Sequence, residues 1–446
     1  MDNMKQRICE WIEGHRDELA DTLCELIDLE SINPWFYDYD PARVPGEEAV
    51  QLYISGKLKE LGFDVELWEP DWRELVQYEG RAGFYRGRDF THRPNLYANL
   101  AGSGGGKSLM LTGHVDVVQV EGEWKYDPFK GVREGDRIYG RGAVDMKGGI
   151  ACMLLAAKAV VESGAKLRGD LHFGLVSDEE AGGMGSLDFM DKGKHDERYK
   201  ADGAIMMEPT DMIVSPMCRG ILWGRLTVPG RSGHIEIKQG DWREGGAVDA
   251  INLARMYLNA IEMKNHEWST DPRKNHPLIP IPCRINIAQI NGGSYPTAYA
   301  DHVDIVFNIQ YLPNERDENL LGGNVKREFE SFVAKVASTN DWLTENPPKI
   351  EWLIDADCSE TPVDSDFVKT FMRSAEATGQ HLKIEGVHCH TDMGYFCNAG
   401  VPTINFGAGQ SKLAHQKDEW IDLNEMIEAT KLIGTMILSW CQEEGR

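Results

Sequence analysis

Acidic residues and histidines follow apolar runs at several separate places in this chain. The runs Leu109–Leu111, Leu171–Val176 and Ala204–Met207 each end within a few residues of such side chains. Short apolar runs of this kind indicate buried strands of a mostly parallel sheet covered by helices. Ligands bind such sheets beyond the carboxyl ends of the strands. The side chains concerned are His114, Asp116, Glu179, Glu180 and Glu208, together with Asp145 before an apolar helix and His415 near the C-terminus. The pattern predicts an α/β fold with carboxylates and imidazoles gathered at strand ends, where they could bind hydrolytic zinc.

The length and charge of the chain limit the classes of protein it can belong to. A chain of 446 residues is too long for one ordinary core, so we expect two domains. The net charge of -25 argues against binding to nucleic acid or to anionic membranes, because both need a basic surface. No signal peptide and no membrane-spanning run are evident, and the nine scattered cysteines favour reduced thiols. We therefore expect a cytoplasmic protein.

The pattern of expected elements changes at about Pro216. Four strands are expected at Ile221–Val228, Ile285–Ile290, Val303–Tyr311 and Ile350–Ile354, and two helices at Gly245–Ala260 and Leu321–Ala337. This β-α-β-β-α-β order predicts a ferredoxin-like α+β domain. We place this inserted domain at 216–356, between two parts of the catalytic domain at 1–215 and 357–446. Before these elements, residues 68–97 look like a long surface excursion with a hairpin.

Some of the candidate site residues have an ordinary structural interpretation as well. His114 and Asp116 would share one face of a strand, so that the carboxylate could accept a hydrogen bond from a ligating imidazole. Taken alone, however, His114 could be a hydrogen-bonded core histidine. Asp145 could be a helix N-cap, or a carboxylate shared by two metals, with Gly148 and Gly149 allowing close backbone approach.

The adjacent pair Glu179 and Glu180 is the most informative motif. Two neighbouring carboxylates after a buried strand repel each other unless a cation or a proton separates their roles. One of them would then bind metal and the other would handle a proton, although a solvated acidic turn is the alternative. Glu208 could simply reach solvent at a strand end, and His234 in the inserted domain could be a surface imidazole.

Taken together and in this order, the five segments resemble the M20 family of metallopeptidases and deacylases. The segments are Gly-His-Val-Asp, Val-Asp-Met-Lys-Gly-Gly, Asp-Glu-Glu-Ala-Gly-Gly, Met-Glu-Pro-Thr and Leu-Ala-His-Gln-Lys-Asp-Glu. The family includes acetylornithine deacetylase, succinyl-diaminopimelate desuccinylase and the bacterial glutamate carboxypeptidases. The resemblance implies a catalytic α/β domain with two zinc ions, and an inserted lid domain through which the protein forms a homodimer.

The resemblance also implies a set of metal ligands. His114 and Glu208 would hold one zinc ion, Glu180 and His415 would hold the other, and Asp145 would bridge the two. Manganese and cobalt are alternatives to zinc in such a site.

The catalytic roles implied by the resemblance fall on three further residues. Glu179 would be the general base, and Asp116 would support the ligating imidazole beside it. His234 would reach the site of a partner subunit and stabilise the oxyanion. The peptide bond between Asp145 and Met146 would be cis, as is usual in relatives.

The inserted domain departs from the pattern of many relatives. Those relatives carry an Asn and, about thirteen residues later, an Arg that help to hold the substrate, whereas this chain has Thr297 and Gln310 at these positions. The chain thereby lacks a guanidinium suited to a carboxylate at that place. Recognition of an ordinary N-acyl amino acid is therefore in doubt, and Arg219, Arg231 and Arg284 are candidate substitutes.

The expected reaction is hydrolysis of an amide-type C–N bond in a small molecule. An N-acyl amino acid deacylase or a deformylase is the first expectation, with a dipeptidase or carboxypeptidase as the alternative. A hydrolytic deaminase on the same site and a catalytically silent dimeric binding protein are further alternatives. The silent protein is disfavoured because the five ligand positions and Glu179 are all intact.

Overall fold

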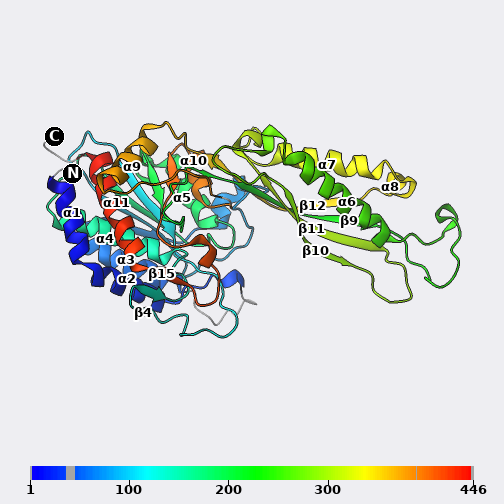
Figure 1. Cartoon of the computed structure of the whole chain (residues 1–446), viewed down its shortest axis with the longest axis horizontal. Coiled ribbons are helices and arrows are strands. Elements are labelled where there is room, and N and C mark those ends of the chain that lie inside the picture. The colour runs from blue at the N-terminus through cyan, green and yellow to red at the C-terminus, as the bar shows by residue number, and fades with distance from the viewer. Residues whose placement is uncertain (1–2, 37–45, 388, 443–446) are drawn as a thin grey trace. The chain divides into compact units, whose positions relative to one another are not determined.

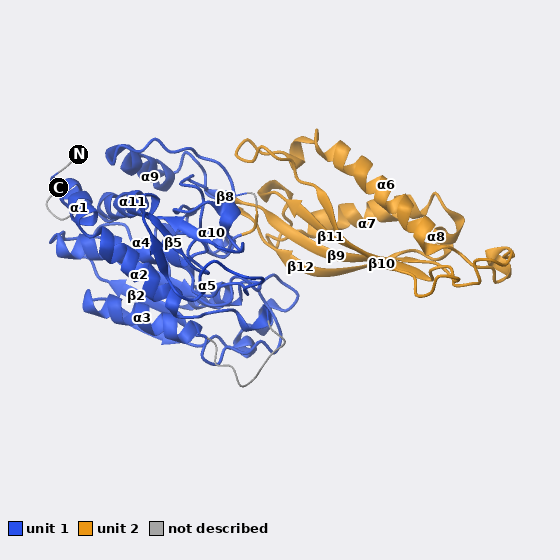
Figure 2. Ribbon diagram, turned by 60° about the horizontal axis from the view of Figure 1, so that its bottom comes forward, with its two compact units in different colours: residues 1–217, 360–387, 391–446 blue, residues 218–359, 388–390 orange. Residues whose placement is uncertain are grey.

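The computed structural model describes residues 3–36, 46–387 and 389–442, which divide into two compact units (Figures 1 and 2). Unit 1 comprises residues 1–217, 360–387 and 391–446, and unit 2 comprises residues 218–359 and 388–390. The chain therefore leaves unit 1, forms unit 2 and returns. A compact unit is not by itself an independently folding domain, so the domain boundaries 1–215, 216–356 and 357–446 stay a prediction.

Unit 1 is built on a six-stranded sheet. In spatial order its strands are β1 (Asp64–Trp68), β2 (Asn95–Leu100), β6 (Leu171–Val176), β3 (Leu109–His114), β7 (Ala204–Met206) and β14 (Thr403–Asn405). The pairs from β6 to β14 are parallel, and β2 pairs antiparallel with both β1 and β6. Every residue of β3 and β6 is buried, as expected for strands covered on both faces. The predicted α/β class with a mostly parallel sheet is confirmed.

Helices cover both faces of this sheet. A Cβ added at Gly113 of β3 would lie 3.7 Å from Met153 in α4, whereas one added at Gly174 of β6 would lie 2.7 Å from Phe189 in α5 and 3.0 Å from Met110 in β3. Because side chains alternate along a strand, Met110 and Gly113 point to opposite faces. Helices α4 and α5 therefore lie on opposite sides of the sheet.

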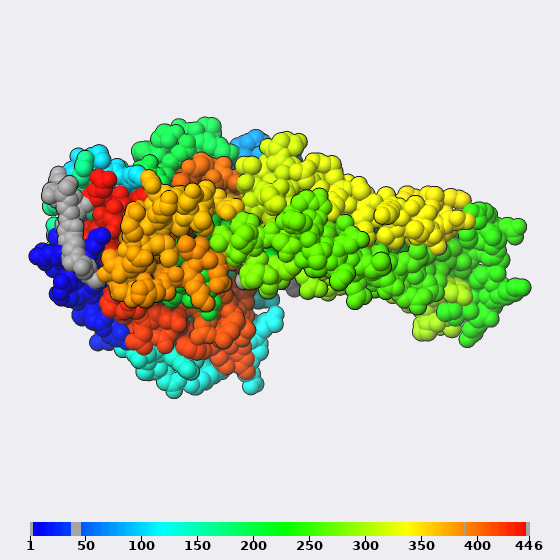
Figure 3. Space-filling view, turned by 45° about the horizontal axis from the view of Figure 1, so that its top comes forward, coloured from blue at the N-terminus to red at the C-terminus, as the bar shows by residue number. Residues whose placement is uncertain are grey.

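The helices of unit 1 come from the whole length of the chain. They are α1 (Asn3–Gly14), α2 (Arg16–Asp28), α3 (Glu47–Glu60), α4 (Lys147–Glu162), α5 (Met184–His195), α9 (Asp366–Ala377), α10 (Met393–Asn398) and α11 (Leu423–Cys441). Apolar residues of α1, α2, α4 and α11 belong to one hydrophobic core. Figure 3 shows the orange segment that includes α9 at the surface, beside red residues near the C-terminus. Both ends of the described chain thus contribute to unit 1.

Two small sheets complete the fold. β4 (Val132–Glu134), β5 (Arg137–Tyr139) and β15 (Trp420–Asp422) form a three-stranded antiparallel sheet, and β8 (Met217–Cys218) pairs with β13 (Ser359–Glu360). The pairing of β5 with β15 ties the segment before Asp145 to the segment after His415. Two parts of the site that are distant in sequence are thereby fixed to each other.

Unit 2 is a four-stranded antiparallel sheet with two long helices. Its elements are β9 (Gly220–Pro229), α6 (Ala250–Trp268), β10 (Ile285–Gly292), β11 (His302–Tyr311), α7 (Gly323–Ala337), α8 (Asp341–Glu345) and β12 (Lys349–Ala356). The strand order β10-β11-β9-β12, with a helix after the first and third strands in sequence, is ferredoxin-like. Alternate residues of β11 are buried, and they pack with α6 and α7 in a separate core. The predicted α+β insertion is confirmed.

Helix α6 begins later than its predicted start at Gly245. Gly245 has φ +98° and ends a short 3-10 turn, so the backbone there is left-handed rather than helical. The helix starts at Ala250 because Asp249 acts as its N-cap, with the side chain accepting a hydrogen bond from Ile251 N at 3.0 Å.

The excursion between β1 and β2 is not a surface feature throughout. Its ends pair as antiparallel strands, and between them lie a 3-10 helix at Trp72–Tyr78 and a series of turns. However, the side chains of Arg88 and Arg93 are only 5% and 1% exposed. The prediction of a surface excursion was wrong for these two residues, because distant carboxylates draw the arginines into the unit. Among the described residues, no helix has the length and apolar character needed to cross a bilayer.

Two glycines in helices of unit 1 make a matched test of close packing. A Cβ at Gly149 in α4 would lie 2.2 Å from Met207 O, whereas one at Gly56 in α3 would meet nothing within 4 Å. We expect Gly149→Ala to lower the free energy of unfolding by about 1–3 kcal/mol through overpacking. Gly56→Ala should raise it by about 0.5–1 kcal/mol, because alanine is the better helix former. Urea denaturation of both variants measures these changes, and equal effects would contradict the close approach of α4 to the end of β7.

Candidate metal centre

Asp145 lies between two histidines at the start of α4. Its Oδ1 is 3.1 Å from His114 Nε2, at the end of β3, and its Oδ2 is 3.2 Å from His415 Nε2, in the loop before β15. The peptide bond between Asp145 and Met146 is cis, as the family resemblance implies. Each oxygen of one carboxylate therefore faces a different imidazole, which is the geometry that a shared metal ligand needs.

Three glutamates surround this pair of histidines. Glu180 Oε2 is 3.1 Å from His415 Nε2. Glu208 Oε1 and Glu179 Oε2 lie 3.7 Å and 4.0 Å from His114 Nε2. The structure thus brings the predicted ligands into two groups, one around each histidine, with Asp145 common to both.

The donor set fits divalent metal ions. Ligand atoms of His114, Asp145 and Glu180 lie within 4.8 Å of one another. The buried oxygens Glu180 Oε1 and Glu208 Oε1 have no hydrogen-bond partner among the described residues. Buried carboxylate oxygens without a partner are costly, and a coordinated cation removes that cost. Carboxylates and imidazoles together are the donors that zinc takes in hydrolytic enzymes.

The protonation of the glutamates reflects the same crowding. Burial, reinforced by the negative charge of Asp145, raises the pKa of Glu180 to about 7. Burial also raises the pKa of Glu208 to about 8, against the opposing charge of His114. Hydrogen bonds from the two histidines outweigh burial and hold the pKa of Asp145 below its usual range. Cations that entered the site would displace protons from the two glutamates.

The carboxylate of Asp116 joins the ends of two strands. The nearest acceptor for His114 Nδ1 is the backbone oxygen of Asp116 at 2.9 Å, and the carboxylate Oδ1 is 3.6 Å away. The carboxylate itself accepts hydrogen bonds from Glu179 N at 3.2 Å and Glu180 N at 3.1 Å. Asp116 therefore holds the backbone of the glutamate turn as well as the ring of His114.

Sequence reasoning missed a buried ion pair behind Asp145. Arg141 Nη1 donates to Glu419 Oε2 at 2.6 Å, and both side chains are buried. Glu419 Oε1 accepts from Val144 N at 2.7 Å and Asp145 N at 3.2 Å, while Arg141 Nη2 donates to His415 O at 3.4 Å. Glu419 is the last residue of the motif Leu-Ala-His-Gln-Lys-Asp-Glu, four residues after His415. Its place in that motif could have indicated a role in supporting the site. Arg88, Arg93 and Asp178 form a second missed group, for which the segment around the arginines gives no local signal.

The remaining candidate residues belong to unit 2. His234 is exposed and lies between β9 and α6, where its backbone oxygen accepts a hydrogen bond from Gln239 Nε2 at 2.8 Å. Gln310 Oε1, on β11, accepts from Arg219 Nη1 at 2.9 Å. Thr297 O accepts from Ile235 N at 2.9 Å. A guanidinium thus does lie beside position 310, although it comes from Arg219, between β8 and β9.

Comparison with known proteins identifies the family. The model of peptidase family M20/M25/M40 matches residues 110–439. This chain belongs to that family. An N-formyl-4-amino-5-aminomethyl-2-methylpyrimidine deformylase of Bacillus subtilis is 30% identical, with 100% of this chain and 99% of the relative covered. A succinyl-diaminopimelate desuccinylase of Methylobacterium radiotolerans is 40% identical over 89% of this chain and 93% of the relative.

Solved structures agree on the fold. A dipeptidase of Saccharomyces cerevisiae superposes with a TM-score of 0.73 at 14% identity, with 100% of both chains covered. An M20 structure from Bacillus subtilis, described as a dinuclear metal binding peptidase, superposes with a TM-score of 0.62 at 11% identity, over 96% of this chain and 98% of that one. The family assignment confirms that this M20 protein is a hydrolase of amide-type C–N bonds, as predicted from the motifs.

Proposed function

We propose that two divalent metal ions, zinc in the first place and manganese or cobalt as alternatives, bind around Asp145. His114 and Glu208 would hold one ion, and Glu180 and His415 the other. The placement of the two oxygens of Asp145, 3.1 Å and 3.2 Å from two different imidazoles, is the observation that carries this proposal.

Glu179 is the proposed general base. Bound zinc ions would polarise the amide carbonyl and lower the pKa of water at the site. The carboxylate of Glu179 would take a proton from this water and deliver it to the leaving nitrogen. Without bound cations, burial, together with the negative charge of Asp392, raises the pKa of Glu179 well above its usual value, and cations at the site would favour the carboxylate form that accepts the proton. Asp116 would hold the turn that carries this base.

We propose that the substrate is an N-formylated amine. The part of it that would contact Gln310 carries no carboxylate. The two relatives of Bacillus subtilis and Halalkalibacterium halodurans, which align over 100% and 96% of this chain, are both named as deformylases of an N-formyl aminomethylpyrimidine. Gln310 carries an amide in place of a guanidinium, and the neighbouring guanidinium of Arg219 already donates to the Gln310 amide oxygen and to Ile281 O. This arrangement suits a neutral partner better than a carboxylate. An N-succinyl amino acid is the second candidate, because the desuccinylase relative is 40% identical over 89% of this chain.

Release of formate tests this function. The zinc-loaded enzyme should hydrolyse N-formyl-4-amino-5-aminomethyl-2-methylpyrimidine with a higher kcat/KM than N-succinyl-diaminopimelate. Glu179→Gln should lower kcat by about 10²–10⁴-fold while both metals stay bound, because only the proton acceptor is lost. Glu180→Ala is the matched control in the adjacent residue, and it should lose metal. A Glu179→Gln enzyme with normal turnover would remove the residue from the mechanism, and preference for the succinyl compound would reverse the choice of substrate.

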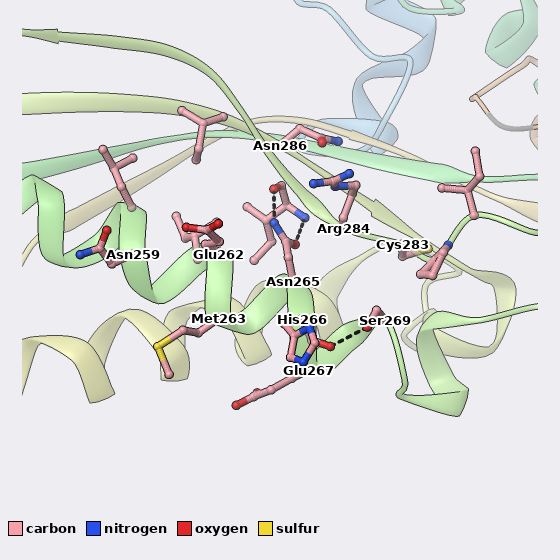
Figure 4. Close-up of a pocket in the computed structure, with 16 residues that line it drawn as sticks. Asn259, Glu262, Met263, Asn265, His266, Glu267, Ser269, Cys283, Arg284 and Asn286 are labelled. Atoms are coloured by element: carbon pink, nitrogen blue, oxygen red, sulfur yellow. Dashed lines mark hydrogen bonds between the residues drawn. The ribbon is translucent and has the colours of Figure 1, made fainter.

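A homodimer formed through unit 2 is part of the same proposal. Strand β10 is an edge of its sheet, and edge strands present unpaired backbone groups to a partner. A groove of about 1240 Å³ lies between β10 and α6, with side chains of both elements lining it (Figure 4). The apolar side chains of Met263, Ile281 and Ile290 are 69%, 53% and 53% exposed nearby. A second copy of the chain, related by twofold symmetry, would cover this surface.

Dimerisation would allow His234 to act on the partner's site. His234 lies in unit 2, whereas every proposed metal ligand lies in unit 1. We propose that its imidazole donates a hydrogen bond to the oxyanion of the neighbouring subunit. One such donor is typically worth roughly 3–4 kcal/mol of barrier.

Subunit exchange distinguishes the two possible arrangements. When His234→Ala and Glu179→Ala proteins, each inactive alone, are mixed in equal amounts, about a quarter of the sites should recover if His234 serves its partner. A heterodimer would then contain one intact site and one site with both defects. The control mixture of Glu180→Ala with Glu179→Ala should recover nothing, because both defects lie in unit 1. No recovery in the first mixture, or a fully active monomer, would contradict the cross-subunit role.

We also propose a cytoplasmic location and a small-molecule substrate. All nine cysteines are free thiols, which favours a reducing compartment. The named relatives act on small molecules, and the acidic net charge of -25 opposes binding to nucleic acid.

A further inference from the structure

We propose that Asp178, held between Arg88 and Arg93, is a positioning residue that directs Glu179 and Glu180 to different parts of the metal centre. The inference rests on the proposed function, because it assigns a purpose to the turn that carries the base and a ligand. It adds a group of residues outside the metal ligands and outside the proposed catalytic set.

Asp178 is fully buried and fully engaged. Its Oδ1 accepts from Arg93 Nη2 at 2.8 Å and from Asn33 Nδ2 at 3.2 Å, and its Oδ2 accepts from Arg88 Nη1. The backbone at Asp178 has φ +75°, a conformation that residues other than glycine rarely adopt. Such a conformation persists where the surrounding contacts fix it, and two guanidinium groups do so here.

The charges in this group balance. Arg93 also donates to Glu47, through Nε at 2.6 Å and Nη2 at 2.9 Å, so that two guanidinium groups face two carboxylates. Arg88 lies 4.3 Å from the ring centre of Trp35 and 3.9 Å from that of Tyr85. Buried charges persist only when they are paired and hydrogen-bonded. Removal of one member of this group would therefore leave a buried charge without its partner.

A chain of hydrogen bonds connects Asp178 to the metal centre. Asn33 Nδ2 donates to Asp178 Oδ1 and also to Asp116 Oδ2, at 2.8 Å for the latter. Asp116 in turn accepts the backbone N–H groups of Glu179 and Glu180. The turn is therefore held through the side chain of its first residue and through the backbone of the next two.

The consequence is the separation of two adjacent carboxylates. Glu180 Oε2 reaches His415 Nε2 at 3.1 Å, while Glu179 Oε2 lies 4.0 Å from His114 Nε2. Without this support, either of the two adjacent carboxylates could turn into the site while the other turned to solvent, because their like charges repel each other. Fixing the turn assigns one glutamate to metal and leaves the other for the proton.

Asp178→Asn tests the proposal with little change in volume. The partners of metal ligands typically contribute 10–100-fold in metal affinity or activity. We therefore expect Zn²⁺ affinity, measured by titration calorimetry, and kcat each to fall by about 10–100-fold, with KM changed by less than about 3-fold. The Co²⁺-loaded variant should show an altered visible absorption spectrum, because the ligand geometry changes. The matched control is Arg86→Gln, which removes an exposed ion pair with Glu79 in the same excursion and should leave all three readouts unchanged.

The outcomes separate this inference from the proposed function and from a merely structural role. Asp178→Asn protein with normal Zn²⁺ affinity, kcat and Co²⁺ spectrum but a lower Tm would overturn the inference. If that variant does not fold, Asn33→Ala removes the bridge between Asp178 and Asp116, together with the hydrogen bond from Trp35 N, and leaves both arginine contacts of Asp178 in place. It should show the same losses to a smaller degree, and unchanged values there would also overturn the inference. If Glu180→Ala keeps both metals, the proposed ligand set itself fails, whatever Asp178→Asn does.

Discussion

The crowding of buried carboxylates around Asp145 is the constraint on which the rest of the site depends. Glu180 and Glu208 lie close enough to this aspartate to disfavour ionisation of one another, and its two oxygens lie 3.1 Å and 3.2 Å from the imidazoles of His114 and His415. Such an arrangement is stable only if protons or cations neutralise it. Metal ions would neutralise it without occupying the carboxylate oxygens with protons.

A buried ion pair and a buried ion-pair network keep the crowded groups in place. The pair of Arg141 with Glu419 holds the backbone at Asp145, and the arginines around Asp178 hold the glutamate turn. Each support reaches a ligand-bearing segment through backbone hydrogen bonds, so that the ligand side chains themselves remain available to metal. Preorganisation of this kind limits the rearrangement needed when metal and substrate bind.

Sequence patterns predicted those helices and strands whose positions depend on residues close together in the chain. The strand β6 and most of the ferredoxin-like unit followed from apolar periodicity, and the motifs picked out the side chains that the structure gathers around Asp145. The start of α6 was misplaced because an N-cap at Asp249, rather than periodicity, sets it. The burial of Arg88 and Arg93 could not be predicted, since their partners lie 46 to 90 residues away in sequence and only the fold brings them together.

The central claim is that two cations compensate the carboxylates around Asp145. Anomalous diffraction at the zinc edge from crystals of the zinc-loaded enzyme tests it most directly. The account predicts two anomalous peaks per chain, each bonded to a different oxygen of Asp145, one also bonded to His114 and Glu208 and the other to Glu180 and His415. No peak at Asp145, or a site in which protonated glutamates hydrogen-bond to that carboxylate in zinc-loaded crystals, would contradict the account.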